Sequence, residues 1–118
     1  MKTRAAVLWG LGEKWEVEEV ELNPPGPNEV LVRLTASGLC HSDEHLVTGD
    51  LPFPLPVVGG HEGAGTVVEI GAGIDDISEG DSVILTFLPS CGHCSYCARG
   101  MGNLCDTGAA VMMGPQLD

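Results

Sequence analysis

The sequence predicts a mainly β domain of the barrel or sandwich type that contains one short helix. Short apolar segments rich in Val recur along the 118 residues, 17 Gly and 8 Pro separate them, and no long helical pattern appears. A chain of this length suits one domain, and we assign residues 1–118 to it. With 43% hydrophobic and only 4% aromatic residues, the core must consist mainly of Val, Leu, Ile and Ala.

The first three strands are expected before residue 37. Thr3–Trp9 is apolar and β-branched, whereas Trp15–Leu22 carries several Glu residues on a polar face. A slip in the alternation of the second segment predicts a β-bulge. After a proline-rich loop over Asn23–Asn28, Glu29–Ala36 alternates cleanly and predicts a strand with one apolar face.

A helix and two further strands follow. His41–Val47 is predicted to be helical, with Ser42 as its N-cap and acidic residues in the first turn. Three prolines make Leu51–Pro56 an extended loop. The last two strands and the Gly- and Asp-containing connection between them are Gly65–Ile70, Gly71–Asp81 and Ser82–Phe87.

The charge balance excludes several classes of function. The sequence has 5 Lys and Arg against 17 Asp and Glu, a formal net charge of −12 that repels phosphate backbones and anionic lipid. No apolar run approaches the ~20 residues that span a bilayer. The short apolar stretch after Lys2 and Arg4 lacks a cleavage site, so we do not interpret it as a signal peptide. We therefore expect a soluble, cytoplasmic protein without nucleic-acid or membrane partners.

Four of the five cysteines form the strongest local motif. They have the spacing C-x2-C-x2-C-x7-C and are Cys91, Cys94, Cys97 and Cys105. Four thiolates complete a tetrahedral zinc shell and leave no open position, which predicts a structural zinc in an irregular lobe over residues 90–107. Buried free thiols, a redox pair and an iron–sulfur cluster are the alternatives. His93 lies inside the lobe, but the shell is already full, so we expect it to be exposed.

The remaining cysteine, Cys40, begins a second group of reactive side chains. A Gly-rich segment further along the chain contains His61 and Glu62. Cys, His and a carboxylate are the donors that an open catalytic zinc site requires, although isolated Cys and His residues are more often structural. The Gly-rich segment has no Lys and does not join a long strand to a helix, which excludes a phosphate-binding loop.

Taken together, these motifs resemble the N-terminal half of the catalytic domain of zinc-dependent alcohol dehydrogenases, in the medium-chain dehydrogenase/reductase superfamily. The similarity covers essentially the whole chain, in the order and at the spacings of that family. Its landmarks are Gly38-Leu39-Cys40-His41-Ser42-Asp43, Gly60-His61-Glu62-Gly63-Ala64-Gly65, Gly80-Asp81-Ser82-Val83 and the four-cysteine lobe. The segment Gly108–Asp118 is also similar to the actinobacterial nicotinoprotein alcohol dehydrogenases. The resemblance implies a GroES-like fold, a partly open β-barrel.

The resemblance also implies a set of metal ligands. Cys40 and His61 would bind the catalytic zinc, and Glu62 would lie beside the metal as an alternate ligand or as a nearby carboxylate. Asp43 would hydrogen-bond to the ligand histidine, a usual arrangement around bound metals.

Four further residues receive roles from the same resemblance. Ser42 would take the proton of the alcohol, and His45 would form the outer end of that relay. His41 would contact a phosphate of the cofactor, and Phe87 would form a wall of the substrate pocket.

The implied reaction is the reversible oxidation of an alcohol to an aldehyde or ketone, with hydride transfer to NAD or NADP. Members of this family are much longer than 118 residues and form homo-oligomers, and their third zinc ligand and Rossmann domain lie beyond the matched segment. The sequence has no G-x-G-x-x-G between a strand and a helix. We therefore expect a fragment that is inactive alone. The alternative is a zinc-stabilised interaction module without catalysis.

Overall fold

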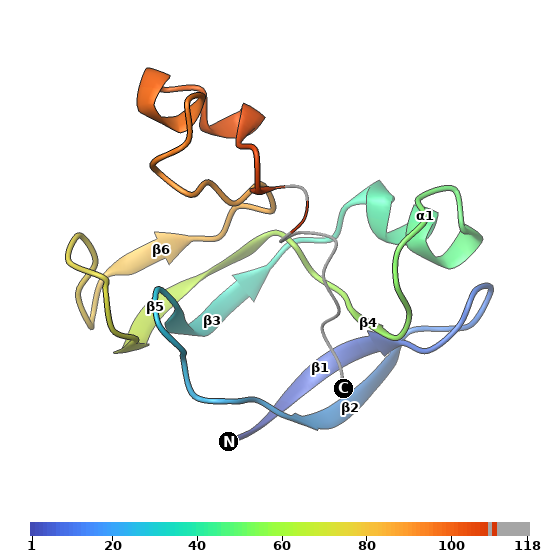
Figure 1. The fold of residues 1–118 in the computed structure, drawn as a ribbon. Coiled ribbons are helices and arrows are strands. Elements are labelled where there is room, and N and C mark those ends of the chain that lie inside the picture. Colours follow the sequence, from blue (N-terminus) through green and yellow to red (C-terminus); the bar gives the residue numbers. More distant parts are fainter. Residues whose placement is uncertain (109, 111–118) are drawn as a thin grey trace.

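Two three-stranded antiparallel sheets form the framework of the protein (Figure 1). The structure, a computed structural model, describes residues 1–108 and 110. The first sheet has the order β2-β1-β4 and consists of β1 (Lys2–Leu8), β2 (Glu16–Glu21) and β4 (Val57–Val58). The second has the order β3-β5-β6 and consists of β3 (Val30–Ser37), β5 (Gly63–Ile70) and β6 (Ser82–Ile84). The sheets do not close into a barrel, which confirms the predicted mainly β, partly open architecture.

The first hairpin pairs without interruption. The register runs from Lys2 opposite Glu21 to Val7 opposite Glu16, so the bulge predicted in the second strand is wrong. The half-buried Glu18 accepts a hydrogen bond from the indole N–H of Trp9, which satisfies this carboxylate without an extra residue in the strand.

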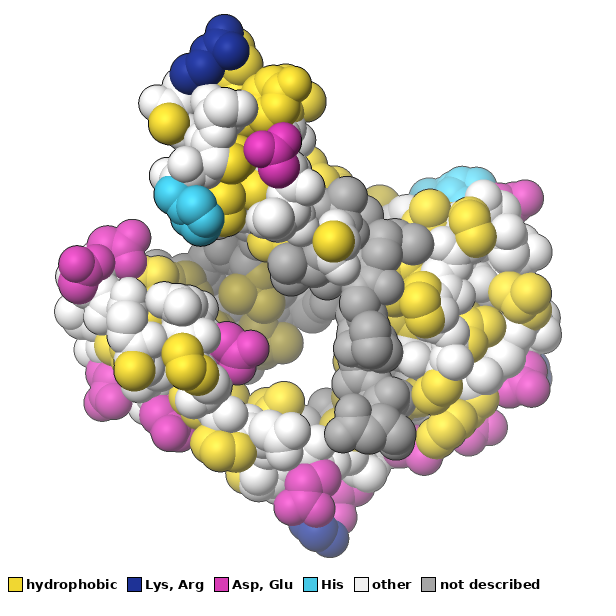
Figure 2. Space-filling view, in the orientation of Figure 1, with side chains coloured by type: hydrophobic (Ala, Val, Ile, Leu, Met, Phe, Trp, Pro, Cys, Tyr) yellow, Lys and Arg dark blue, Asp and Glu magenta, His cyan; other side chains and the backbone are white. Residues whose placement is uncertain are grey.

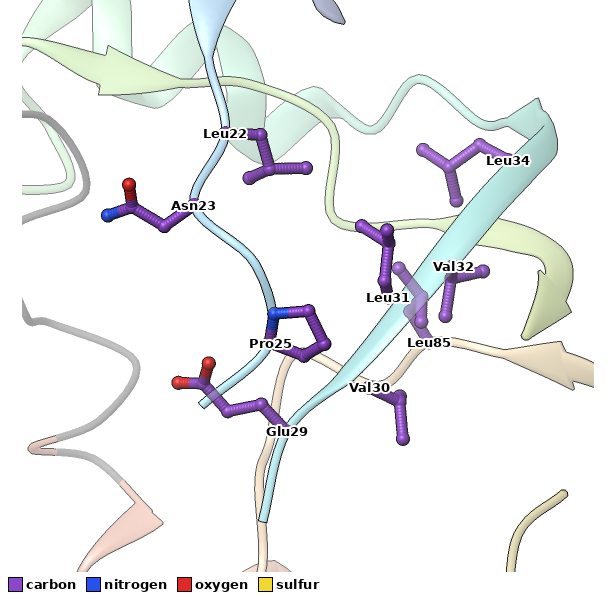
Figure 3. Close-up of a pocket in the computed structure, with 9 residues that line it drawn as sticks. All are labelled: Leu22, Asn23, Pro25, Glu29, Val30, Leu31, Val32, Leu34 and Leu85. Carbon is purple, nitrogen blue, oxygen red and sulfur yellow. The ribbon is translucent and has the colours of Figure 1, made fainter. Parts of the chain in front are cut away.

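Bulges occur instead in β3, where the register to β5 shifts between Leu31 and Val32 and again between Leu34 and Ala36. The predicted clean alternation of this strand is therefore wrong. Because of the shifts, consecutive apolar residues of β3 line one hollow of about 290 Å³ together with Leu85 (Figure 3).

Two strands of the second sheet differ from their predicted bounds: β5 begins earlier than the predicted start at Gly65, and β6 is shorter than predicted. β5 starts at Gly63, and β6 ends at Ile84, before the predicted end at Phe87. A Cβ at Gly65 would lie 2.2 Å from the carbonyl oxygen of Arg33, so glycine allows β3 and β5 to approach closely at this point. Strand β4 has only two residues, too few to give a pattern in the sequence.

Helix α1 (His41–Thr48) follows β3 and begins after Cys40, which corrects the predicted N-cap at Ser42. The carboxylate of Asp43 accepts a hydrogen bond from the Cys40 backbone N–H at 3.0 Å and so caps the N-terminus of the helix. Gly49 ends the helix with a left-handed φ of 81°, and its N–H donates to the carbonyl of His45. No helix in the described part of the chain is long and apolar enough to cross a bilayer.

The hydrophobic core is small. Its buried members come from both sheets and are Val7, Leu8, Val57 and Val67. Many other apolar side chains lie at the surface, as Figure 2 shows, and two of them are more than four-fifths exposed: Leu39 and Ile84. The cysteine lobe projects from the second sheet and contains two short 3-10 turns, η1 (Cys97–Arg99) and η2 (Gly102–Leu104) (Figure 1). None of the residues of the lobe up to Thr107 is buried, so the lobe has no hydrophobic core of its own.

Candidate metal centres

The four cysteines of the lobe converge on one point. Their sulfur atoms all lie within 4.8 Å of one another, and all four residues are half-buried. A tetrahedral ion with Zn–S distances of about 2.3 Å requires sulfurs about 3.8 Å apart, so small shifts would close the shell. The set is Cys91, Cys94, Cys97 and Cys105.

Backbone N–H groups already support negative charge on these sulfurs. The N–H of Cys91 points to the sulfur of Cys105 at 3.3 Å, and the N–H of Cys94 points to the sulfur of Cys91 at the same distance. The hydroxyl of Thr107 and backbone N–H groups lower the pKa of the Cys105 thiol to about 5. Burial and the neighbouring thiols raise the pKa of Cys97 to about 12. A bound cation would favour the thiolate form of all four.

His93 is not part of this shell. It is exposed, as expected, and its Nδ1 lies 2.7 Å from the carbonyl oxygen of Cys91. The donor group thus consists of sulfur alone, and a metal bound to all four sulfurs would have no open coordination position for water or substrate.

A second group of donors forms where α1 meets the loop between β4 and β5. Cys40 precedes the helix, and His61 and Glu62 end the loop. Their ligand atoms lie within 4.8 Å of one another, and the side chain of Glu62 is exposed. One thiolate, one imidazole and one carboxylate match the donor set of an open zinc site, in which a fourth position remains for substrate.

Glycine at position 38 leaves room for the third donor. A Cβ at Gly38 would lie 2.0 Å from Oε2 of Glu62, so any larger residue would occupy the space of this carboxylate. The Gly38 N–H also donates to the carbonyl oxygen of Glu62 at 2.9 Å and fixes the backbone there. Gly60, with φ of 98°, turns the chain just before His61. The space around the donors thus fits a metal-binding arrangement.

Asp43 connects the helix to His61. Its side chain is only 5% exposed. One carboxylate oxygen caps α1 through the Cys40 N–H, whereas the other, Oδ1, has no hydrogen-bond partner among the described residues and lies 3.4 Å from Nδ1 of His61. A His61 ring protonated at Nδ1 would satisfy this buried oxygen and direct Nε2 toward Cys40 and Glu62. The unpartnered oxygen therefore fits a histidine that binds metal through Nε2.

The electrostatics of this cluster act in opposite senses on two of its donors: they favour the thiolate of Cys40, which binds a metal, but also the protonated ring of His61, which must lose a proton before it can bind one. Interactions with Ser42 and His61 lower the pKa of the Cys40 thiol, against the opposing effects of burial and of Glu62. Burial acts to lower the pKa of His61, but its contacts with Cys40 and the charge of Asp43 outweigh that effect and raise it.

Ser42 and Phe87 flank the same imidazole. The hydroxyl oxygen of Ser42 lies 3.4 Å from Nε2 of His61. The Phe87 ring packs edge-on against the His61 ring, with centroids 5.5 Å apart, and is 53% exposed. The structure therefore brings a hydroxyl and an apolar wall to the open side of the donor cluster.

His45 and His41 lie outside this cluster, on the surface of α1. Their ring centroids are 4.9 Å apart. Nδ1 of His45 lies 3.3 Å from Oδ2 of Asp50, which in turn accepts a hydrogen bond from the Thr48 hydroxyl at 2.7 Å. Within the described residues, Ser42 and His45 make no hydrogen bond to each other, so a relay between them needs an intervening group.

Sequence reasoning did not assign roles to Gly38, Thr48 or Asp50. Gly38 stands two residues before Cys40, but only the fold shows which side chain needs its space. Asp50 directly follows Gly49, which ends the helix, and His45 lies in the last turn. This closeness in sequence was the signal that could have indicated a contact between Asp50 and His45. The similarity noted for the segment 108–118 falls largely on positions outside the described residues.

Proteins of one family are similar to this chain in sequence. Residues 26–115 match the family described as alcohol dehydrogenase GroES-like domain. Alcohol dehydrogenase B of Mycobacterium tuberculosis is 52% identical over 115 residues, which cover 97% of this chain and 31% of that protein. NDMA-dependent alcohol dehydrogenase of Amycolatopsis methanolica is 51% identical over 118 residues, 100% of this chain and 32% of that protein.

A solved structure gives the same result. The alcohol dehydrogenase zinc-binding domain protein from Burkholderia ambifaria superposes with a TM-score of 0.85 at 42% identity, over 91% of this chain and 29% of that one. The chain thus spans about a third of the length of the curated relatives that it matches.

Proposed function

The chain belongs to the alcohol dehydrogenase GroES-like domain family, and from this premise we propose that it forms the zinc-binding part of a dehydrogenase that oxidises a small alcohol. The observation that carries the proposal is the convergence of Cys40, His61 and Glu62 beside the Ser42 hydroxyl and the Phe87 ring. The resemblance to the nicotinoprotein subgroup agrees with the similarity to the NDMA-dependent relative.

Each residue near the donor cluster has a distinct task in this proposal. Cys40, His61 and Glu62 would hold zinc, which as a Lewis acid lowers the pKa of the alcohol substrate. Asp43 orients His61 through Nδ1 and raises its basicity at Nε2. The ring of Phe87 shields one side of the site from water and contacts the apolar part of the alcohol.

The alcohol proton leaves through Ser42. Its hydroxyl lies beside the donor cluster, whereas His45 lies further out on α1 with access to solvent. Since the two side chains are not hydrogen-bonded to each other, a water molecule or a cofactor hydroxyl would complete the path. His41, on the first turn of α1 and exposed, is proposed to contact a phosphate of NAD or NADP.

The four-cysteine lobe is proposed to bind a structural zinc. Its sulfur-only shell has no open position, so it orders the chain over residues 90–107 and takes no part in the reaction. We assign residues 1–118 to one GroES-like domain. The five free thiols suit a reducing compartment, so we place the protein in the cytoplasm, and we expect the complete enzyme to be a homo-oligomer.

Zinc analysis of the 118-residue chain provides the first test. We expect two zinc ions per chain after weakly bound metal has been removed by gel filtration, of which the lobe ion survives dialysis against a mild chelator and the other exchanges. A saturated, folded chain that binds only the lobe zinc would contradict the assignment of Cys40, His61 and Glu62.

Turnover needs a protein that also binds the cofactor. We suggest replacing the matched segment of the Amycolatopsis relative, which is 51% identical, with this chain and assaying alcohol oxidation. Ser42→Ala should lower the rate by ~10²–10⁴-fold, the usual contribution of a positioned proton-transfer group. Ser95→Ala, in the exposed part of the lobe, is the matched control. A folded chimera that contains both zinc ions but is inactive would refute the proposed function.

A further inference from the structure

We propose that α1 carries a third metal-binding site, in which His41 and His45 bind a borderline divalent transition metal such as Ni²⁺ or Zn²⁺. This site is separate from both the cysteine lobe and the Cys40 cluster, and it does not depend on the proposed function. Any occupancy would compete with the roles suggested above for the same two histidines.

The first argument is the position of the two imidazoles on the helix. Residues four apart on an α-helix lie one above the other on the same face. The rings of His41 and His45 are in contact, with centroids 4.9 Å apart and planes at 81°. Histidine side chains gather at the α1 surface in the space-filling view (Figure 2). Small rotations of exposed side chains would bring one nitrogen of each ring to a shared ion.

The second argument is that a carboxylate lies beside one nitrogen of one of the two rings, on the side away from a shared ion. Asp50 lies 3.3 Å from Nδ1 of His45, and the Thr48 hydroxyl holds that carboxylate at 2.7 Å. In the tautomer that carries its proton on Nδ1, toward Asp50, the lone pair of Nε2 is free to bind a metal, as in the carboxylate–histidine arrangements around bound metals. The same pairing occurs between Asp43 and His61 in the Cys40 cluster.

The third argument is that an ion can reach both rings and that the charge of the surrounding sequence favours a cation. The side chain of His45 is 43% exposed, and His41 is exposed, so an ion can reach both. The sequence has no Lys or Arg from residue 34 to residue 98, and its net charge is −12, so no basic residue in this part of the chain opposes a cation. Only two protein nitrogens bind, and water fills the other positions, which predicts an affinity well below that of the cysteine lobe.

The experiment uses the 118-residue chain after it has been loaded with zinc at its other sites and freed of excess metal. Ni²⁺ is then added in a calorimetric titration, and released zinc is followed with a colorimetric chelator. We expect one additional equivalent of Ni²⁺ to bind without release of zinc. His41→Gln or His45→Gln should each weaken this binding at least tenfold. Asp50→Asn should weaken it by ~10-fold while both imidazoles remain, because it removes only the support of the ring.

His93→Gln is the matched control, because His93 is exposed but lies in the lobe. Retention of the extra equivalent in this variant, with its loss in the two helix variants, would support the site. The proposal is wrong if no additional Ni²⁺ binds, if Ni²⁺ binds only by displacing zinc, or if His41→Gln and His45→Gln bind like the original chain. A failure of the proposed function would instead appear in the zinc count and chimera activity, so the two outcomes are distinguishable.

Discussion

Gly38→Ala isolates the contribution of the third donor in the Cys40 cluster. The added Cβ would lie 2.0 Å from Oε2 of Glu62 and 3.1 Å from both Cδ and Cβ of the same residue, so the severe clash is with the carboxylate and the contact with Cβ needs a shift of only a few tenths of an ångström. Non-bonded contacts of this kind need more than 3 Å, so the carboxylate must move by about 1 Å or more, out of its position beside Cys40 and His61. Gly38 does not adopt a left-handed φ, so the backbone tolerates alanine.

The expected loss follows from the number of ligands. Zinc binding by four protein ligands has an apparent free energy of about 10–16 kcal/mol, or roughly 3 kcal/mol for each ligand. Loss of one ligand therefore corresponds to about a hundredfold in affinity. Since the clash involves the flexible end of an exposed side chain, we expect the free energy of unfolding of the metal-free chain to change by less than about 1 kcal/mol.

The measurement is a competition titration of the weaker zinc site against a chelator of known affinity, with the lobe zinc in place. Three variants form a double-mutant cycle: Gly38→Ala, Glu62→Ala and the combination. Because both single changes act on the same carboxylate, the combined variant should bind zinc about as well as Glu62→Ala alone.

Two results would refute this reasoning. Zinc affinity in Gly38→Ala equal to that of the original chain would mean that Glu62 does not bind the metal, or that its side chain adapts without loss. A large further drop when Gly38→Ala is added to Glu62→Ala would mean that the glycine acts through its contact with the backbone and Cβ at position 62 and not through the carboxylate.

The other predictions concern the supporting residues and the lobe. Asp43→Asn should retain the helix cap but weaken the Cys40 site by ~10–100-fold, measured by the same competition, while Asp43→Ala should also lower the helix content in circular dichroism. Cys97→Ser should release the lobe zinc and expose its amide groups to fast hydrogen exchange while β1 stays protected; retained zinc would contradict the all-sulfur shell. Gly59→Ala should lower the free energy of unfolding in urea by about 1–3 kcal/mol, because the Cβ would lie 2.7 Å from the Trp15 ring, and an unchanged value would show that the ring moves freely. The 118-residue chain with added NAD should show no alcohol oxidation, and measurable turnover would contradict the need for a separate cofactor domain.

The lobe is the part of this protein that the sequence determined almost completely. Its four cysteines fall within fifteen residues, so their spacing alone limits how far apart the sulfurs can lie. The strands of the first hairpin could also be predicted from the sequence, because β-branched residues and the turn residues that bound a strand are local sequence signals.

The Cys40 cluster is different, because Cys40 and Glu62 are 22 residues apart along the chain. Motif similarity suggested Cys40, His61 and Glu62, but only the packing of α1 against the loop before β5 brings their donor atoms within 4.8 Å. The two contacts of the Asp43 carboxylate also depend on the tertiary structure. One oxygen accepts a hydrogen bond from the backbone of its own helical turn, whereas the other lies beside His61, which is distant in sequence.

Details of register were also decided by the tertiary structure. The Glu-rich second strand pairs regularly although the alternation of its sequence slips, whereas β3 contains bulges although its sequence alternates cleanly. A sequence pattern records which residues prefer burial, but the number of residues that face each partner strand depends on how closely two backbones approach. At Gly65 that approach leaves no room for a Cβ, and this contact between β3 and β5 is not encoded in either strand alone.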